Sequence, residues 1–351
     1  MKKPNIHKSI VLLLSVSVCL TAASIMRAEA RQPNHCEVGV ADSCLMRAEA
    51  DAFLRRMPAD LQQHQTRAIL KAIAGDNADL VAVRSSRNAQ PQYSDNVRTA
   101  MISDNMRIYE PCDCRDEKLP VLLYLHGGGW TFGSINSCGR FCNAVAADGR
   151  MKVVALDYRL APEHPYPAGL NDCIDAVGYI ITHADELNID VNRITLGGDS
   201  SGGNLALATA LSAECRSKIE SLLLFYPVTK AYNDDSESWH AYGKGFGLDA
   251  EIMEAFNRAY TRNVDPRQPL ISVGLCSDDE IRQLPRTLLI AAERDILCDQ
   301  GKSFADRMGD KAKRIEYEGA VHLFITVPGQ QTAFERAIAD ALTFIYDRTT
   351  D

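Results

Sequence analysis

The chain has 351 residues, a length that suits one large α/β domain with a cap rather than two independent folds. Its 46 acidic and 38 basic side chains give a formal net charge of −8. A chain this acidic should repel nucleic acids and anionic membrane surfaces, so neither is an expected partner.

The first 30 residues have the order of regions found in a secretory signal peptide. Three lysines precede an apolar run over 10–20, and small residues at 28–30 supply a cleavage site. The apolar run is short for a membrane span, which needs about 20 apolar residues. We therefore expect an exported protein, periplasmic or secreted, with no stable membrane insertion after cleavage. The alternative is a membrane anchor made by an uncleaved N-terminal segment.

The cysteine content of the exported chain predicts disulfide bonds. Removing residues 1–30 takes away four basic and one acidic side chain, which moves the net charge from −8 to −11, and leaves ten of eleven cysteines. An even number of cysteines in an exported chain favours disulfides. Cys36 with Cys44 is the easiest local pair, whereas helical spacing would hold the Cβ atoms of Cys138 and Cys142 roughly 6 Å apart, too far for a bond. No C-x2-C pair occurs, so no zinc site is expected.

Residues 31–90 are predicted to form an N-terminal helical cap region, because apolar residues recur at three- and four-residue steps over 43–57 and 59–74. These helices could pack over the mouth of a site. Residues 91–351 are predicted to form the catalytic domain, and the segment 93–107 is expected to enter its sheet.

From residue 120 on, apolar strand-like runs alternate with helical runs, which is typical of a mostly parallel sheet flanked by helices. Candidate strands are 121–125, 153–156, 193–197, 221–226, 287–292 and 313–318, and candidate helices are 138–148, 169–183, 204–215, 302–309 and 330–347. The polar segment 227–267 interrupts this alternation and is predicted to be a second part of the cap. Its aromatic side chains that could line an acyl pocket are Trp239, Tyr242, Phe246 and Phe256.

The most informative motif is G-x-S-x-G at 198–202, which follows an apolar run and precedes a helix-forming segment. Strand, Gly-flanked serine and helix together are the context of a nucleophile elbow, in which a strained turn exposes the serine. The frame selects Ser200, because Ser201 would need glycine where Asp199 stands. The helix N-terminus then points its free N–H groups at the charge that forms during acyl transfer. Ser200 is the predicted nucleophile.

A second motif lies 70 residues upstream, where the strand over 121–125 opens into HGGGW at 126–130. Glycines after a core strand let the backbone approach a ligand and present N–H donors to it. An HGGG loop in this position supplies part of the oxyanion hole in lipases and esterases, together with the residue after the nucleophile. The predicted donors are the N–H groups of Gly128, Gly129 and Ser201.

The general base is selected by chain order, since this arrangement runs serine, acid, histidine. Only His240 and His322 follow Ser200. No strand and acid-bearing turn precede His240, whereas His322 follows the short strand-like run 315–319. His322 is therefore the predicted base.

The acid is expected just past the carboxyl end of the strand over 287–292, because active-site groups gather at the carboxyl ends of strands in open α/β sheets. Asp295 occupies that place. Glu293 is expected to remain on the strand, and Asp299 to lie in the next turn or the start of a helix. In this arrangement Asp295 would orient His322 and stabilise its charged form.

These residues resemble the hormone-sensitive-lipase-like carboxylesterase family of the α/β-hydrolase fold, which is marked by HGGGW and GDSAGG motifs. The matching segments are 126–130, 157–168, 198–203, 293–295, 299–301 and 321–324. The resemblance implies an α/β-hydrolase with a helical cap, catalytic residues Ser200, Asp295 and His322, and an oxyanion hole at Gly128, Gly129 and Ser201. In the segment 157–168 we expect the charged residues Asp157, Arg159 and Glu163 to lock the loop through internal ion pairs.

The sequence therefore predicts a serine carboxylesterase that needs no cofactor and acts on short- to medium-chain acyl esters. The alternatives are an amidase or formamidase that uses the same triad, and a ligand-binding relative that has lost turnover. The natural ester and the oligomeric state are not predicted.

Overall fold

The computed structural model describes residues 35–114 and 118–347, so the predicted signal peptide lies outside the described residues. The chain divides into two compact units, Met1–Ala41 and Asp42–Asp351. Of the first unit only the start of helix α1 (His35–Arg56) is described. All contacts given below belong to the second unit.

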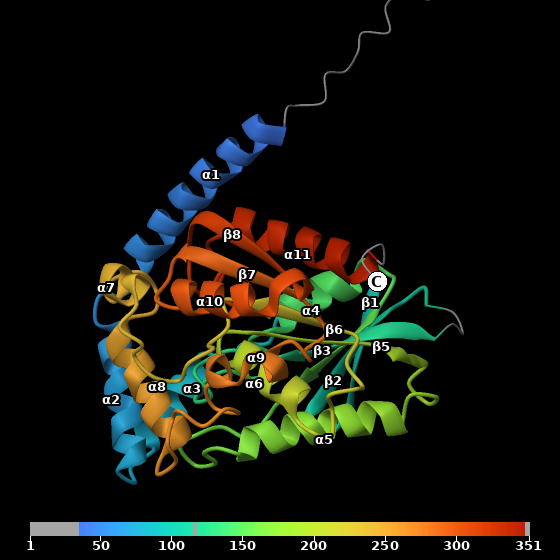
Figure 1. The fold of residues 1–351 in the computed structure, drawn as a ribbon, viewed down its shortest axis with the longest axis horizontal. Coiled ribbons are helices and arrows are strands. Elements are labelled where there is room, and N and C mark those ends of the chain that lie inside the picture. Colours follow the sequence, from blue (N-terminus) through green and yellow to red (C-terminus); the bar gives the residue numbers. More distant parts are fainter. Residues whose placement is uncertain (1–34, 115–117, 348–351) are drawn as a thin grey trace, which may run out of the picture. The chain divides into compact units, whose positions relative to one another are not determined.

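A mostly parallel eight-stranded sheet forms the centre of the second unit, as the fold prediction required (Figure 1). Its strand order is β1-β2-β4-β3-β5-β6-β7-β8, and only β2 runs antiparallel to its neighbours β1 and β4. The strands are β1 (Val97–Ser103), β2 (Met106–Pro111), β3 (Leu119–Leu125), β4 (Lys152–Leu156), β5 (Ile189–Asp199), β6 (Ser221–Phe225), β7 (Arg286–Arg294) and β8 (Ala312–Val321). The middle strands are apolar over nearly their whole length because both sheet faces are covered.

Helices cover both faces of this sheet. The core on one face includes side chains of α4 (Gly139–Ala146) and α11 (Gln331–Tyr346), and the core on the other includes those of α5 (Ala168–Thr182), α6 (Ser201–Leu211) and α10 (Cys298–Met308). Shorter elements complete the fold: α9 (Asp278–Ile281) and two 3-10 turns, Val273–Leu275 and Gly309–Lys311.

Helices from two distant parts of the chain pack together near the carboxyl ends of the strands. They are the later part of α1, α2 (Leu61–Ile73) and α3 (Ala78–Ser86) from the N-terminal region, and α7 (Glu237–Tyr242) and α8 (Ala250–Thr261) from the segment after β6. Figure 1 shows α2 and α8 side by side. The Gln62 side chain accepts a hydrogen bond from the Asp249 N–H at 2.8 Å, and Arg262 donates to the Ile73 carbonyl at 3.0 Å. The two parts of the predicted cap region are therefore in contact, while their division into domains stays a prediction.

Several elements of the fold were not predicted from the sequence. The segment 93–107 was expected simply to enter the sheet, but it contributes β1 and then turns into β2, which was not predicted. Helix α3 was also not predicted as a separate helix. Strand β8 continues to Val321 instead of ending at Gly319, so His322 follows the strand directly.

The disulfide prediction is wrong for the described cysteines. Nine cysteines have free thiols: Cys44, Cys112, Cys114, Cys138, Cys142, Cys173, Cys215, Cys276 and Cys298. The predicted Cys36–Cys44 pair involves Cys36, whose side chain lies outside the described residues, whereas Cys44 is free. Five of the free thiols are buried in the core.

The loop after β4 is held by ion pairs to other elements, so the prediction of internal pairs is wrong. Arg159 pairs with Asp172 of α5 at 2.8 Å, and Glu163 pairs with Arg84 of α3 at 2.8 Å. Asp157 is 3.8 Å from the His126 ring. The charges therefore fasten the loop to the helices on either side of it.

Candidate active site

Ser200 occupies the sharp turn between strand β5 and helix α6. Its backbone has φ +54° and ψ −118°, a conformation that side-chain-bearing residues rarely adopt and that stores strain. Neighbouring backbone holds it there: the Ser200 N–H donates to the Phe225 carbonyl at 2.9 Å, and the Ser200 carbonyl accepts from the Val228 N–H at 3.1 Å. Strand β6 and the segment after it thus hold the N–H and the carbonyl of Ser200 in place, which stabilises the strained turn.

The glycines around Ser200 are required by the closeness of strand β3. A Cβ atom on Gly202 would overlap the Leu125 carbonyl oxygen, and one on Gly198 would lie 2.6 Å from the same oxygen. Helix α6 can therefore begin at the end of β5 only if these two positions lack side chains. The G-x-S-x-G spacing thus follows from the packing of the elbow against β3.

The structure brings Ser200, His322 and Asp295 into one hydrogen-bonded line. His322 Nε2 lies 3.1 Å from Ser200 Oγ, and His322 Nδ1 lies 2.6 Å from Asp295 Oδ2. The other carboxylate oxygen, Oδ1, accepts the Leu297 N–H at 3.1 Å. His322 and Asp295 are both 2% exposed, so water does not compete for the bond between them.

Two residues that the sequence reading missed position the His322 loop. Gln330, buried just before α11, donates from Nε2 to the carbonyls of Val321 and His322 and accepts the Val321 N–H at 2.9 Å. The Tyr226 ring lies 4.3 Å from the His322 ring, and its hydroxyl accepts the Ile325 N–H. No motif marks these residues, because their role depends on contacts between distant segments.

Gly128 and Gly129 adopt positive φ angles of 122° and 61° after strand β3. In the described part of the chain their N–H groups donate no hydrogen bond, and both residues line the same cavity as Ser200. Ser201 is the first residue of α6, where a backbone N–H has no acceptor within the helix. Among the described residues, the N–H groups of Gly128, Gly129 and Ser201 therefore have no hydrogen-bond acceptor, as donors of an oxyanion hole would require.

His126 and Tyr158 support this glycine loop from behind. Their rings stack at 4.3 Å, and the Tyr158 hydroxyl donates to the His126 carbonyl at 2.7 Å. Burial lowers the pKa of His126, which favours the neutral ring. His126 thus supports the glycine loop through its contacts with Tyr158.

Asp199 ties the elbow to the glycine loop. Its Oδ1 accepts hydrogen bonds from the Tyr124 hydroxyl and the Gly127 N–H, both at 3.0 Å. Burial raises the pKa of this carboxyl to about 6, against the effect of those two donors. At neutral pH the folded protein therefore holds a costly buried charge here.

Replacing Asp199 by asparagine should remove this cost and keep both hydrogen bonds, since both reach Oδ1. The folded-state pKa of about 6 exceeds the ordinary 3.8, so wild-type stability falls as pH rises through this range, by up to about 3 kcal/mol from this group. Urea unfolding of both proteins at pH 4, 5, 6 and 7 measures their free energies of unfolding. We expect the free energy of unfolding of Asp199→Asn to increase relative to that of the wild-type protein as pH rises. A difference independent of pH would contradict this assignment.

The residues next to Asp295 have other partners. Glu293 is on strand β7, as expected, and pairs with Arg47 at 2.8 Å. Arg294 pairs with Asp51 at 2.7 Å. Asp299 lies in the first turn of α10, where it accepts the Ser238 N–H at 2.8 Å. The first two pairs fasten α1 to the end of β7, and of these four residues only Asp295 contacts His322.

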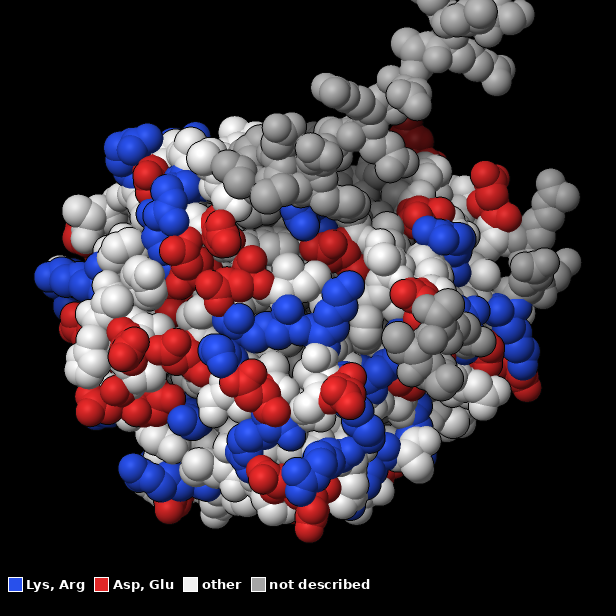
Figure 2. Space-filling view, turned by 45° about the horizontal axis from the view of Figure 1, so that its top comes forward, with Lys and Arg blue, Asp and Glu red and all other residues white. Residues whose placement is uncertain are grey.

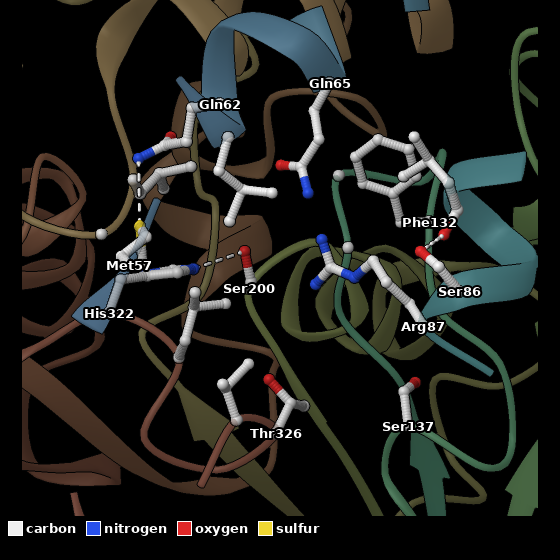
Figure 3. Close-up of a pocket in the computed structure, with 18 of the residues that line it drawn as sticks. Met57, Gln62, Gln65, Ser86, Arg87, Phe132, Ser137, Ser200, His322 and Thr326 are labelled. Carbon is white, nitrogen blue, oxygen red and sulfur yellow. Dashed lines mark hydrogen bonds between the residues drawn. The ribbon is translucent and has the colours of Figure 1, made fainter. Parts of the chain in front are cut away.

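Ser200 and His322 open onto a cavity of about 1350 Å³ (Figure 3). Its walls come from the glycine loop, from α1, α2 and α3, and from α8. Of the four aromatic residues that could line an acyl pocket or pack between cap and core, Phe256 lines the cavity. Trp239 is buried in the core, and Tyr242 and Phe246 contact each other at 5.0 Å.

Among the described residues, no group of three or more His, Cys, Asp or Glu side chains is placed to hold a metal ion. Within the same part of the chain, none of the helices has the length and apolar character needed to cross a membrane.

Comparison with known proteins agrees with this geometry. A sequence model of a family with the alpha/beta hydrolase fold matches residues 122–326. The chain is 32% identical over 245 residues to carboxylesterase NlhH of Mycobacterium tuberculosis, covering 67% of this chain and 76% of that protein. It is 31% identical over 290 residues to Lipase 2 of a Moraxella strain, covering 72% of this chain. The chain spans 66% of that lipase's length.

A solved structure of similar fold is a hyperthermophilic esterase from the archaeon Pyrobaculum calidifontis. It aligns with a TM-score of 0.68 at 28% identity, over 78% of this chain and 95% of the esterase. With the sheet order, the elbow and the matched segment, these similarities identify the family. The chain belongs to the hormone-sensitive-lipase-like family of the α/β-hydrolase fold.

Proposed function

We propose that this protein is a serine carboxylesterase that hydrolyses short- to medium-chain acyl esters through an acyl-enzyme on Ser200. The observation that carries the proposal is the line from Asp295 through His322 to Ser200 at 2.6 and 3.1 Å, at the wall of a cavity. The esterases among its relatives support the same reaction.

In the first half of the reaction, Ser200 Oγ attacks the ester carbonyl carbon while His322 Nε2 takes the hydroxyl proton. The carbonyl oxygen becomes an oxyanion, which the N–H groups of Gly128, Gly129 and Ser201 stabilise. Asp295 holds the imidazole in the tautomer with its proton on Nδ1 and stabilises the imidazolium. The bond to the alcohol oxygen then breaks, and His322 gives its proton to the departing alkoxide.

In the second half, a water molecule replaces the alcohol. His322 accepts a proton from the water as its oxygen attacks the acyl carbon, and the same N–H groups hold the second oxyanion. The bond to Ser200 Oγ breaks, His322 returns the proton to the serine, and the carboxylic acid leaves. The two halves consume one ester and one water and release one alcohol and one acid.

The polar side chains in the cavity support a preference for shorter acyl chains. Gln62, Gln65 and Arg87 line it together with apolar residues of α1 and α8. A long alkyl chain would have to displace water from these groups without replacing their hydrogen bonds, which costs affinity.

The test is turnover of p-nitrophenyl acetate, butyrate, octanoate and palmitate by the purified protein. We expect kcat/KM to be highest for acetate or butyrate and lowest for palmitate. Highest activity on palmitate would contradict the chain-length assignment. Absence of turnover on all four esters by a folded protein would contradict the esterase assignment and favour amide hydrolysis or ligand binding alone.

A further inference from the structure

Arg87 is a cation inside the cavity that forms no ion pair with any acidic side chain of the described residues. It directly follows α3, is partly buried, and lines the cavity that Ser200 and His322 also line. Its guanidinium carbon lies 5.2 Å from the centre of the Phe132 ring. Among the described residues, its guanidinium forms no ion pair and donates no hydrogen bond. Figure 3 shows the guanidinium turned into the cavity.

Arg84, one turn earlier, shows how a structural arginine is satisfied in the same region. Its guanidinium donates to Glu163 at 2.8 and 2.9 Å, and to the carbonyls of Thr131 and Ala161 at 2.8 and 2.7 Å. Arg87 has none of these partners. Burial accordingly lowers the pKa of Arg87, with no acidic group acting against it.

A second unpartnered polar group faces the same space. Gln65 of α2 is only 6% exposed, and Figure 3 shows its amide turned into the cavity. No hydrogen bond to its side chain is found within the described chain. The Gln65 amide therefore faces the open space of the cavity with its hydrogen-bonding groups available to a ligand.

The charge of the cavity wall is opposite to that of the whole chain. The net charge of the chain is −8, and basic and acidic side chains are interspersed over the face shown in Figure 2. The cavity wall, however, includes Arg56, Arg87 and Arg140 against one acid, Asp199. Asp199 already binds the Tyr124 hydroxyl and the Gly127 N–H. A low-dielectric cavity concentrates this positive potential on a bound ligand.

Resting on the function proposed above, we propose that Arg87 and Gln65 bind a carboxylate carried by the ester substrate, so that the preferred substrates are esters bearing a second, ionised carboxyl group. A guanidinium binds a carboxylate through two parallel N–H···O bonds. The Gln65 amide can donate one more hydrogen bond to the same group. An uncharged ester of the same length would leave both side chains without a partner.

Two matched pairs of esters test this and distinguish the side of the ester that carries the charge. Monomethyl adipate and methyl hexanoate differ at the end of the acyl chain, and 4-acetoxybutanoate and butyl acetate differ at the end of the alcohol. Initial rates are measured by titration of the released acid. We expect the wild-type protein to have a higher kcat/KM for the anionic member of at least one pair.

Arg87→Gln should lower the anionic-to-neutral ratio of kcat/KM in that pair by about 10- to 100-fold, the range for loss of a charge-assisted pair. Arg87→Lys should lower the ratio less, because lysine keeps the positive charge but cannot donate two parallel hydrogen bonds to one carboxylate. Gln65→Leu should lower it several-fold. Arg98→Gln is the control, since Arg98 is an exposed residue of β1 outside the cavity wall and its loss changes the net charge equally.

A ratio that does not change in Arg87→Gln and Arg87→Lys would overturn the proposal and leave Arg87 as a packing partner of Phe132. Methyl hexanoate hydrolysis by the wild-type protein would then show that the esterase function still stands. If the wild-type protein hydrolysed none of the four esters, both proposals would fail. Should Arg87→Gln not fold, Arg87→Lys and Gln65→Leu give the same comparison.

Discussion

Replacing Ser200 by alanine should lower kcat for p-nitrophenyl butyrate by about a millionfold, to the residual rate that oxyanion stabilisation and binding alone provide. The change removes only the Oγ atom that lies 3.1 Å from His322 Nε2. The alanine variant should keep the conformation of the turn, because backbone hydrogen bonds to Phe225 and Val228 hold it. Thermal unfolding should therefore be little changed.

Ser86→Ala is the matched control, because Ser86 also lines the cavity but its hydroxyl donates to the Val83 carbonyl. We expect its kcat to stay within a few-fold of the wild-type value. Turnover by folded Ser200→Ala at even a hundredth of the wild-type rate would show that another group attacks the ester.

Replacing Asp295 by asparagine should lower kcat by about 10⁴-fold, as expected when the histidine is held in the wrong tautomer. Asp295 Oδ1 accepts the Leu297 N–H and Oδ2 faces His322 Nδ1. Asparagine that keeps the first bond must point its NH₂ group at Nδ1. The imidazole proton would then move to Nε2. A protonated Nε2 cannot accept the Ser200 proton.

Asp299→Asn provides the comparison, because Asp299 lies four residues further on and binds the Ser238 N–H instead of the histidine. Its kcat should change by less than about tenfold. If Asp299→Asn lost as much activity as Asp295→Asn, the assignment of the acid would be contradicted.

The candidate site residues could be named from the sequence because each motif is a local consequence of packing. The position of Ser200 follows from Gly198 and Gly202, which leave room for β3 and are only four residues apart in the sequence. His322 and Asp295 could be selected from chain order and from the strands before them. The distance of 2.6 Å between His322 Nδ1 and Asp295 Oδ2 could not be predicted, because it depends on the pairing of β7 with β8.

Features that depend on the choice of a distant partner were not predictable. Arg159 and Glu163 are four residues apart, yet they pair with Asp172 and Arg84 on different helices. Gln330 clamps the His322 loop through side-chain hydrogen bonds. In the sequence it is a polar residue before a helix, like many others.

The parallel strands were easier to predict than the hairpin of β1 and β2. The middle strands are buried on both faces, so they form uninterrupted apolar runs. Strand β1 lies at the edge, and most of its residues are exposed or partly exposed. Its burial pattern therefore lacks the regular alternation on which strand prediction depends.

The proposed mechanism requires that Ser200 becomes acylated with His322 as its base. The most direct measurement is peptide mapping by mass spectrometry after treatment with diethyl p-nitrophenyl phosphate, which phosphorylates activated serines and stops at that stage. We predict one diethylphosphoryl group on Ser200, its formation slowed at least a thousandfold in His322→Ala, with none on the adjacent Ser201. A modified Ser201, or a protein that still hydrolyses esters without any adduct on Ser200, would contradict the account.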